Sequence, residues 1–569
     1  MRIFRALLII SLALLGSGFF FWNPLSIRTA TLPNGARLEP AECWFENTEL
    51  IRIDCAYFYT RKQLPDTPVF KLPVLVMRDS WFKNSSTSMI SLAGGPGGAS
   101  YIDKDSMPYW ISEFVAQDWG LDVVMFDQRG TGLSEPLLRC KDSNELRLET
   151  LAQDLSGRED FEQFKRQMQH CYDQYAKQSV IKPYLKQLST SYSASDIADL
   201  RDLLDVEQWV LNGVSYGTRL ALETARQYPD IVKSMVLDSV YPPRYDGFET
   251  LAENSFNGIQ RLMQRCETDE LCNEVYPDLS SSLMAALNTL SREPLLLQVP
   301  REDSKKPSKS LMLTAERLIL LLDYTGYDSR LFGDIPAGIK AVNDADTGSK
   351  SLLKLASNYL EVELFEEFSD AVYMVIECSE NGQFKAAELM QRLQPFREKY
   401  PMLDWSPNAL YDPQMCVNWR NSAVTESRNH REPAGTDKPT LILAGALDSV
   451  TPPEWGKQRA ATLPNSRYLE YADMAHAVLS SSLCASDEVQ LFLNPELKKT
   501  AFCDKDEREY EQTGRALEWV MPHIEPSIDA LGGVVPDIEP AADETTADSS
   551  DDSSGLTKSP DDTPAVDTL

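Results

Sequence analysis

Residues 213–217 read Gly213-Val214-Ser215-Tyr216-Gly217 and follow an apolar run at residues 209–211. The apolar run predicts a buried strand, and residues 218–228 have the apolar spacing of a helix. The two glycines allow a tight, strained turn between strand and helix, which would hold the hydroxyl of Ser215 above the edge of a sheet. The Gly-x-Ser-x-Gly pattern is weak by itself, but its position between a strand and a helix makes it informative.

Further strands and helices alternate on both sides of this turn. The apolar runs that predict strands are residues 72–77, 89–92, 121–126, 439–445 and 468–471. Residues 195–204 have the spacing of a helix, with Ser195 as its N-cap. Alternating strands and helices predict the α/β class with a mostly parallel sheet.

Residues 245–431 differ from the rest of the chain. They contain long helical patterns, such as residues 311–324 and 352–378, and few strand signals. We expect a helical cap inserted into the sheet domain, lying over the carboxyl edge of the sheet, where α/β sheets place their ligand sites.

A Ser nucleophile requires a base and an orienting acid, which in such a fold follow the Ser in the order acid, then His. His476 is the one His that follows a short strand near the end of the folded body. Asp448 lies just past the strand at residues 439–445, whereas Asp473 is so close to His476 in sequence that it suits a local turn better. The sequence therefore predicts a triad of Ser215, Asp448 and His476.

A glycine-rich loop follows the strand at residues 89–92. It reads Gly94-Gly95-Pro96-Gly97-Gly98 and has few side-chain atoms to obstruct a substrate carbonyl. We expect a backbone N–H of this loop to bind an oxyanion together with the N–H of Tyr216. The alternative is an ordinary tight turn.

These motifs resemble those of α/β-hydrolases of the proline iminopeptidase and tripeptidyl aminopeptidase type. The resemblance also includes Asp127-Gln128-Arg129-Gly130-Thr131-Gly132 and Leu447-Asp448-Ser449-Val450-Thr451-Pro452-Pro453, and it covers residues 72–493. It departs at Ala93, where many relatives have His before the two glycines. This leaves the loop intact but puts a close relation to the proline iminopeptidases in doubt.

The resemblance implies an α/β-hydrolase fold with a helical cap. It implies the triad named above, an oxyanion donor at Gly95 beside Tyr216, and Arg129 as a brace of the site. It implies no metal or organic cofactor.

The overall charge excludes some classes of function. The chain has 569 residues with 55 Lys and Arg against 86 Asp and Glu, a net charge of −31 that argues against a nucleic-acid partner. With 43% hydrophobic and 25% charged residues, the chain is neither wholly disordered nor a multi-span membrane protein. Acids dominate from Pro536 onward, so we expect residues 530–569 to be a disordered tail, with an acidic partner-binding segment as the alternative.

The amino terminus predicts export. Arg2 and Arg5 precede residues 6–22, which carry no charge and lie near the lower length limit for crossing a bilayer. Small residues at 16–18 suit cleavage. We expect residues 1–25 to be a signal peptide or an uncleaved membrane anchor, and a buried core helix is the weaker alternative.

The ten cysteines agree with an exported chain. Neighbours in sequence make compact candidate pairs: Cys43 with Cys55, Cys140 with Cys171, Cys266 with Cys272, Cys378 with Cys416, and Cys484 with Cys503. Buried free thiols are the alternative. There is no Cys-x-x-Cys motif and the chain has only four His, so no zinc site is predicted.

These observations give a domain plan and an expected function. The plan is a hydrolase core at residues 40–244 and 432–510, the second part resembling the carboxyl-terminal region of tripeptidyl aminopeptidases, with the cap at 245–431 between them. The resemblance implies a serine exopeptidase that acts in an exported compartment and releases amino-terminal residues from short peptides. A carboxylesterase on the same triad and a catalytically inactive binding protein are the alternatives. The oligomeric state is not predicted.

An exopeptidase must recognise a free ammonium group, for which a buried carboxylate is the natural partner. Acids in the cap are concentrated at residues 361–367 and 377–380, and Glu380 is the candidate. The alternative is that these acids form solvated faces of cap helices.

Overall fold

The computed structural model describes residues 27–46, 50–80, 86–301, 307–381, 385–406, 409, 412–420, 435–497 and 519–520. The predicted export segment at residues 1–25 and the predicted acidic tail at residues 530–569 lie outside these residues. Within the described part, no helix is both long enough and apolar enough to span a membrane.

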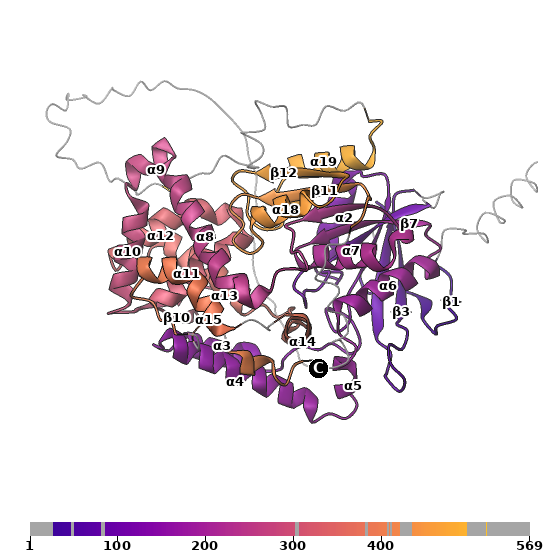
Figure 1. The fold of residues 1–569 in the computed structure, drawn as a ribbon, viewed down its shortest axis with the longest axis horizontal. Coiled ribbons are helices and arrows are strands. Elements are labelled where there is room, and N and C mark those ends of the chain that lie inside the picture. The colour runs from indigo at the N-terminus through magenta and orange to yellow at the C-terminus, as the bar shows by residue number, and fades with distance from the viewer. Residues whose placement is uncertain are drawn as a thin grey trace, which may run out of the picture. The chain divides into compact units, whose positions relative to one another are not determined.

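A ten-stranded mixed sheet forms the body of the described chain (Figure 1). Its spatial order is β1 (Ala30–Thr31), β2 (Arg37–Ala41), β3 (Arg52–Tyr59), β4 (Lys71–Arg78), β6 (Asp122–Phe126), β5 (Thr87–Leu92), β7 (Gln208–Val214), β8 (Val232–Asp238), β11 (Thr440–Gly445) and β12 (Ser466–Tyr471). From β6 to β12 the neighbouring strands are parallel, which confirms the predicted mostly parallel α/β sheet. In the antiparallel edge formed by β1 to β4, only β4 was predicted, as the strand at residues 72–77.

Helices cover both faces of this sheet. Alternate residues of β7 point to opposite faces, so Leu211 packs with α6 (Thr190–Leu203) and α7 (Tyr216–Gln227), while Val210 packs with α2 (Met107–Gln117) and α19 (Leu483–Leu493). Both faces are therefore buried, which explains why the central strands are continuous apolar runs.

The helix before β7 begins earlier than its pattern predicts. Its N-cap is Ser189, whose hydroxyl accepts a hydrogen bond from the N–H of Tyr192 at 3.1 Å. The assignment of Ser195 as N-cap is therefore wrong. Several hydroxyl residues between 189 and 195 are all suitable caps, and sequence spacing alone cannot select among them.

The chain between β8 and β11 is mainly helical. Its helices are α8 (Gly247–Glu267), α9 (Glu270–Val275), α10 (Leu279–Leu290), α11 (Ala315–Tyr324), α12 (Ile335–Asn343), α13 (Lys350–Glu363), α14 (Asp370–Glu380), α15 (Ala386–Arg392) and α16 (Gln394–Lys399). Two expectations are met only in part. The expected helix at 311–324 is confirmed for residues 315–324 as α11, but residues 311–313 belong to a strand, β10 (Lys309–Leu313), which pairs with β9 (Leu295–Val299). The expected helix at 352–378 is divided between α13 and α14.

Four disulfides join eight of the nine described cysteines. They are Cys43–Cys55, Cys140–Cys171, Cys266–Cys272 and Cys378–Cys416, with Cα–Cα distances of 5.1–5.2 Å. These four predicted pairs are confirmed, whereas the fifth includes Cys503, which lies outside the described residues. Four disulfides indicate an oxidising, exported environment.

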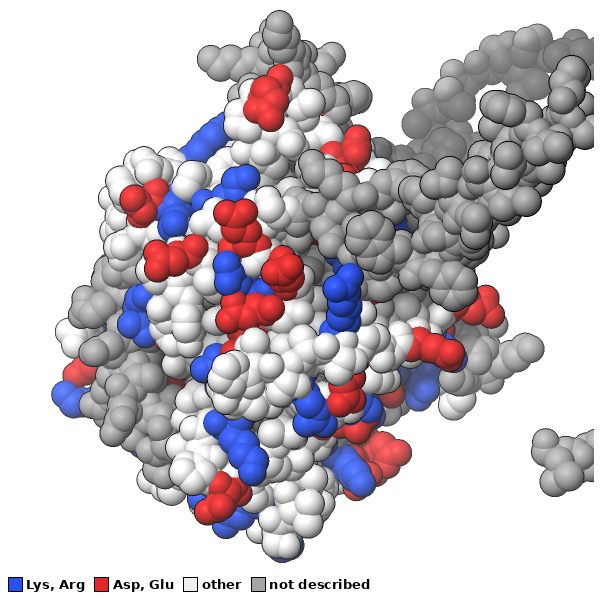
Figure 2. All heavy atoms as spheres, turned by 90° about the vertical axis from the view of Figure 1, so that its right-hand side faces the viewer, with Lys and Arg blue, Asp and Glu red and all other residues white. Residues whose placement is uncertain are grey.

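The charged side chains are interspersed on the face that Figure 2 presents. Lys and Arg alternate there with Asp and Glu, and neither sign forms a continuous patch on the described residues in this view.

Candidate active site

Ser215 occupies a strained turn between β7 and α7. Its φ of 56° and ψ of −123° lie in a region that side-chain-bearing residues rarely adopt. A Cβ on Gly217 would approach the carbonyl oxygen of Leu92 to 2.0 Å, so only glycine allows α7 to pass this close to β5. The Ser215 N–H donates to the carbonyl of Asp238 at 3.0 Å, which fixes the turn against β8.

His476 and Asp448 form a buried pair. Nδ1 of His476 lies 2.8 Å from Oδ2 of Asp448, and the Asp448 side chain is fully buried. The carboxylate also accepts hydrogen bonds from the N–H groups of Val450 and Thr451, each at 2.8 Å, and from the Thr451 hydroxyl at 2.7 Å. Because both carboxylate oxygens are held in this way, Asp448 can orient the imidazole with little freedom of its own.

The alternative acid, Asp473, has a different partner. Its carboxylate oxygens lie 2.6 and 3.1 Å from the guanidinium of Arg265 on α8. Asp473 thus joins the loop before His476 to helix α8. The acid that contacts His476 is Asp448.

The surroundings of His476 alter its pKa. Burial lowers the pKa of the imidazole, but the charge of Asp448, its hydrogen bond and the charge of Asp238 together raise it above the ordinary value.

The Ser215 hydroxyl makes no hydrogen bond to His476 within the described part of the chain. Such contacts are commonly long in enzymes without substrate and tighten when substrate binds.

The glycine loop lies against Ser215. A Cβ on Gly94 would stand 3.1 Å from Cβ of Ser215, and Gly95 has a φ of 112°. The side-chain amide of Gln128 donates to the carbonyl of Ala93 at 3.1 Å, which secures the start of the loop. The Tyr216 N–H is among the first amides of α7, which have no partner inside the helix. The predicted oxyanion donors at Gly95 and Tyr216 thus belong to adjacent segments.

Arg129 braces the fold behind the site. Its guanidinium binds both carboxylate oxygens of Asp196 on α6, at 2.6 and 2.7 Å, and donates to the carbonyl of Gln187 at 3.2 Å. Both partners of the ion pair are 1% exposed. Arg129 therefore contacts none of the three predicted triad residues and instead fixes α6, which packs beside α7.

Glu380 lies close to the turn but is bound to the fold. Its carboxylate accepts hydrogen bonds from the N–H and the hydroxyl of Thr190, at 2.8 and 2.7 Å, at the start of α6. The same hydroxyl lies 2.8 Å from the hydroxyl of Tyr216. A carboxylate is favoured at a helix N-terminus, so a structural role accounts for these contacts.

Glu377, one helical turn earlier, is a second buried carboxylate near the turn. Burial raises its pKa to about 7, although the charge of Arg219 and the amide of Asn381 act in the opposite direction. Its side chain is 1% exposed and accepts a hydrogen bond from the Tyr241 hydroxyl at 3.2 Å. Glu377 belongs to the acidic group at residues 377–380 noted in the sequence, but nothing in the sequence distinguishes it from Glu380.

The cap contacts both parts of the site. The ring of Tyr327, in η2 (Thr325–Tyr327), lies 5.5 Å from the ring of His476. The backbone N–H of His476 donates to the carbonyl of Gly326 at 2.8 Å. At the other side, the N–H of Ser369 before α14 donates to the carbonyl of Gly97 at 2.9 Å. The helical segment between β8 and β11 therefore contacts both His476 and the glycine loop.

Comparisons with known proteins agree with this geometry. A family model described as "alpha/beta hydrolase fold" matches residues 88–482. The chain is 24% identical to the "Putative hydrolase YuaR" of Escherichia coli (strain K12) over 389 residues, which cover 64% of this chain and 69% of that protein. It is 24% identical to the "Tripeptidyl aminopeptidase" of Streptomyces lividans over 428 residues, covering 71% and 74%. It is 23% identical to the "Serine protease Hip1" of Mycobacterium tuberculosis (strain ATCC 25618 / H37Rv), covering 71% and 78%.

Proposed function

The chain belongs to the α/β-hydrolase family, and we propose that it is an exported serine exopeptidase that releases residues from the amino end of short peptides. The observation that carries the proposal is the buried Asp448–His476 pair at 2.8 Å on the same sheet edge as the strained turn of Ser215. The four disulfides support export.

The proposed reaction proceeds through an acyl-enzyme. Nε2 of His476 accepts the proton of the Ser215 hydroxyl as its oxygen attacks the substrate carbonyl, while Asp448 holds Nδ1. The N–H groups of Tyr216 and Gly95 bind the oxyanion. His476 then gives the proton to the leaving amine. A water molecule attacks the acyl-enzyme, and His476 accepts its proton and returns it to the Ser215 oxygen as the acyl group leaves.

Specificity for an amino terminus would come from the carboxylates on α14. Two relatives carry the names aminopeptidase and serine protease, which supports a peptide substrate over an ester. Glu380 remains the candidate from the sequence, although both of its oxygens already bind Thr190. Glu377 is the stronger candidate, because an ammonium group would convert a buried carboxylate with an unfavourable environment into a stable ion pair.

A matched pair of substrates tests the proposal. A tripeptidyl amide with a free amino terminus should be cleaved, and its amino-acetylated twin should be cleaved at least roughly tenfold more slowly, since a charge-assisted contact is lost. Glu377→Gln should remove this difference by slowing only the free peptide. Equal cleavage of both peptides, together with faster cleavage of short-chain esters, would instead identify a carboxylesterase. Failure to hydrolyse any of these substrates would favour an inactive binding protein.

A further inference from the structure

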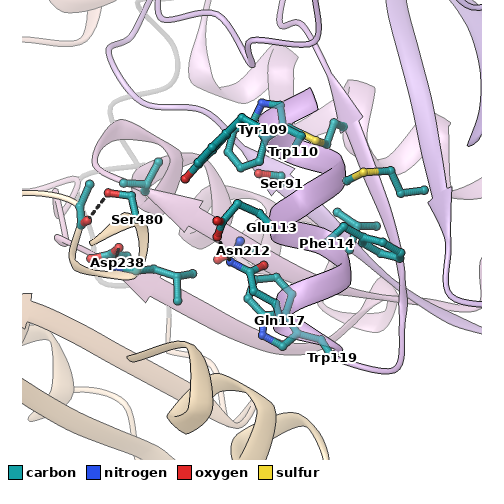
Figure 3. Close-up of a pocket in the computed structure, with 16 residues that line it drawn as sticks. Ser91, Tyr109, Trp110, Glu113, Phe114, Gln117, Trp119, Asn212, Asp238 and Ser480 are labelled. Carbon is teal, nitrogen blue, oxygen red and sulfur yellow. Dashed lines mark hydrogen bonds between the residues drawn. The ribbon is translucent and has the colours of Figure 1, made fainter. Parts of the chain in front are cut away.

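A cavity lies on the face of the sheet opposite α7 (Figure 3). It encloses about 150 Å³ between α2, the ends of β5, β7 and β8, and residues 477–480. Asn212 and Val214 line it, and they share a strand face with Val210, which packs under α2 and α19. The cavity is therefore separated from the side of the sheet on which α7 begins.

Aromatic side chains form much of the wall. Trp110 and Phe114 stand one helical turn apart on α2, and Trp119 follows after the helix (Figure 3). A cavity of this volume holds a single aromatic ring. Its mouth is open, since Tyr109 at the rim is 48% exposed, and this leaves room for a short substituent on the ring.

Several polar groups in the wall lack partners. The indole N–H groups of Trp110 and Trp119 make no hydrogen bond to any described residue, but both nitrogen atoms are buried within the wall and are not accessible from the cavity. The side chains of Ser91 and Asn212 likewise bond to none of the described residues, and in Figure 3 both lie between α2 and the strand ends. The Ser91 hydroxyl and the Asn212 amide can each donate a hydrogen bond, so the cavity is suited to an occupant that carries an acceptor.

The charged residues in the wall determine whether the cavity favours a cationic or an anionic occupant. Glu113 and Asp238 line the cavity, and no Lys, Arg or His is found among the described residues around it. Glu113 is half-buried, and its carboxylate accepts from the amide of Gln117 at 3.2 Å, so it keeps acceptor capacity at the mouth. Anions are repelled, whereas a cation gains both the carboxylate and the aromatic faces.

We propose that this cavity binds a small aromatic ammonium compound that carries a hydrogen-bond acceptor on its ring. The ring packs among Trp110, Phe114 and Trp119, the acceptor binds the Ser91 hydroxyl or the Asn212 amide, and the ammonium binds Glu113. The site needs neither Ser215 nor the peptidase activity.

An occupant would contact the loop that carries His476. Asp238 accepts hydrogen bonds from the N–H groups of Val478 and Leu479, at 3.0 and 2.8 Å, and the Ala477 N–H donates to the Ser239 hydroxyl at 2.8 Å. Because Ala477, Leu479 and Ser480 line the cavity, a bound ligand stabilises this loop in its folded position.

Three probes of matched shape test the site on the intact protein. Tyramine is a cation, 4-ethylphenol is neutral and 4-hydroxyphenylacetate is an anion, and calorimetric titration measures the affinity of each. Tyramine should bind best, 4-ethylphenol roughly tenfold more weakly, and the anion not measurably. Tyramine should also slow amide hydrogen exchange at residues 477–480.

Variants locate the binding site. Glu113→Gln should weaken tyramine roughly tenfold and leave 4-ethylphenol unchanged, because only the charge is removed. The control Glu274→Gln removes an exposed acid on α9 and should change neither affinity. Glu377→Gln should leave tyramine binding intact.

Four results would overturn the proposal. They are equal affinity for all three probes, tyramine binding that Glu113→Gln does not weaken, tyramine binding that only Glu377→Gln removes, and binding without slower exchange at residues 477–480. The third would place the amine at the buried carboxylates of α14. None of these results depends on whether Ser215 is the nucleophile.

Discussion

Glu380 and Thr190 are joined by two hydrogen bonds, at 2.8 and 2.7 Å, across the boundary between the cap and the sheet domain. One bond reaches the backbone N–H and the other the hydroxyl, so the first turn of α6 is held by a residue of α14. Thr190 in turn contacts the Tyr216 hydroxyl at 2.8 Å. Helix α14 is therefore linked, through Thr190, to the start of α7, the helix that follows the proposed nucleophile.

Replacing Ser215 should abolish catalysis without unfolding the protein. Ser215→Ala should lower turnover of a peptidyl amide by at least roughly a thousandfold, because no other group can form the acyl-enzyme. The control Ser281→Ala, at an exposed position of α10, should have wild-type turnover. If Ser215→Ala kept most of the activity, or if a phosphonate probe labelled another serine, the proposed nucleophile would be wrong.

A second pair of variants separates the two acids near His476. Asp448→Asn should lower kcat by roughly ten-thousandfold, since the imidazole is then held in the wrong tautomer. Asp473→Asn should lower the melting temperature by weakening the ion pair with Arg265, while kcat changes little. Steady-state kinetics and thermal melts on both variants check this, and the opposite ranking of the two kcat values would reassign the acid.

The pH dependence of hydrolysis should reflect the raised pKa of His476. The base must be neutral, so kcat/KM should fall as the pH drops through the His476 pKa, at a pH above the ordinary histidine value of about 6.5. Removing the nearby charge in Asp238→Asn should move this limb to lower pH. A limb that stays in place in Asp238→Asn would show that Asp238 does not act on His476.

The pH dependence of stability should reveal Glu377. Its pKa is about 7 in the folded protein against 4.5 for the free group, so the folded state binds this proton more tightly. The stabilising contribution is present below pH 4.5 and is lost as the pH rises to about 7, a change of roughly 3 kcal/mol. Glu377→Gln should remove this slope in denaturant titrations between pH 5 and 8, and an unchanged slope would exclude a buried proton at this site.

The site residues that the sequence predicts are those that a pattern of neighbouring residues marks. The turn at Ser215 is recognisable because a strand, two glycines and a helix follow one another within a few residues. Asp448 and His476 follow from chain order and from their position after strands. Arg129 was recognised only through the resemblance, since its partner Asp196 is 67 positions away.

What could not be predicted depends on contacts distant in sequence. Thr190 and Glu380 are 190 positions apart, so nothing near Glu380 indicates that its carboxylate is already bound. The strands β9 and β10 are short, and the apolar residues of β10 continue into α11. The spacing of apolar residues therefore changes from that of a strand to that of a helix without a clear boundary in the sequence. In the antiparallel edge only β4 was predicted, as the strand at residues 72–77, because β1, β2 and β3 depend on pairing between segments that carry no individual signal.

Helix α14 is held at both of its ends. Ser369 bonds the glycine loop just before the helix begins, and Cys378 near its end is bonded to Cys416. In a newly made chain whose thiols are still reduced, the Cys378–Cys416 disulfide is absent. Helix α14, which contacts the glycine loop through Ser369, is then held less firmly. If the chain is exported as proposed, this disulfide forms only after translocation, so the support of the glycine loop is completed outside the cytoplasm and the proposed peptidase would be poorly active in the producing cell.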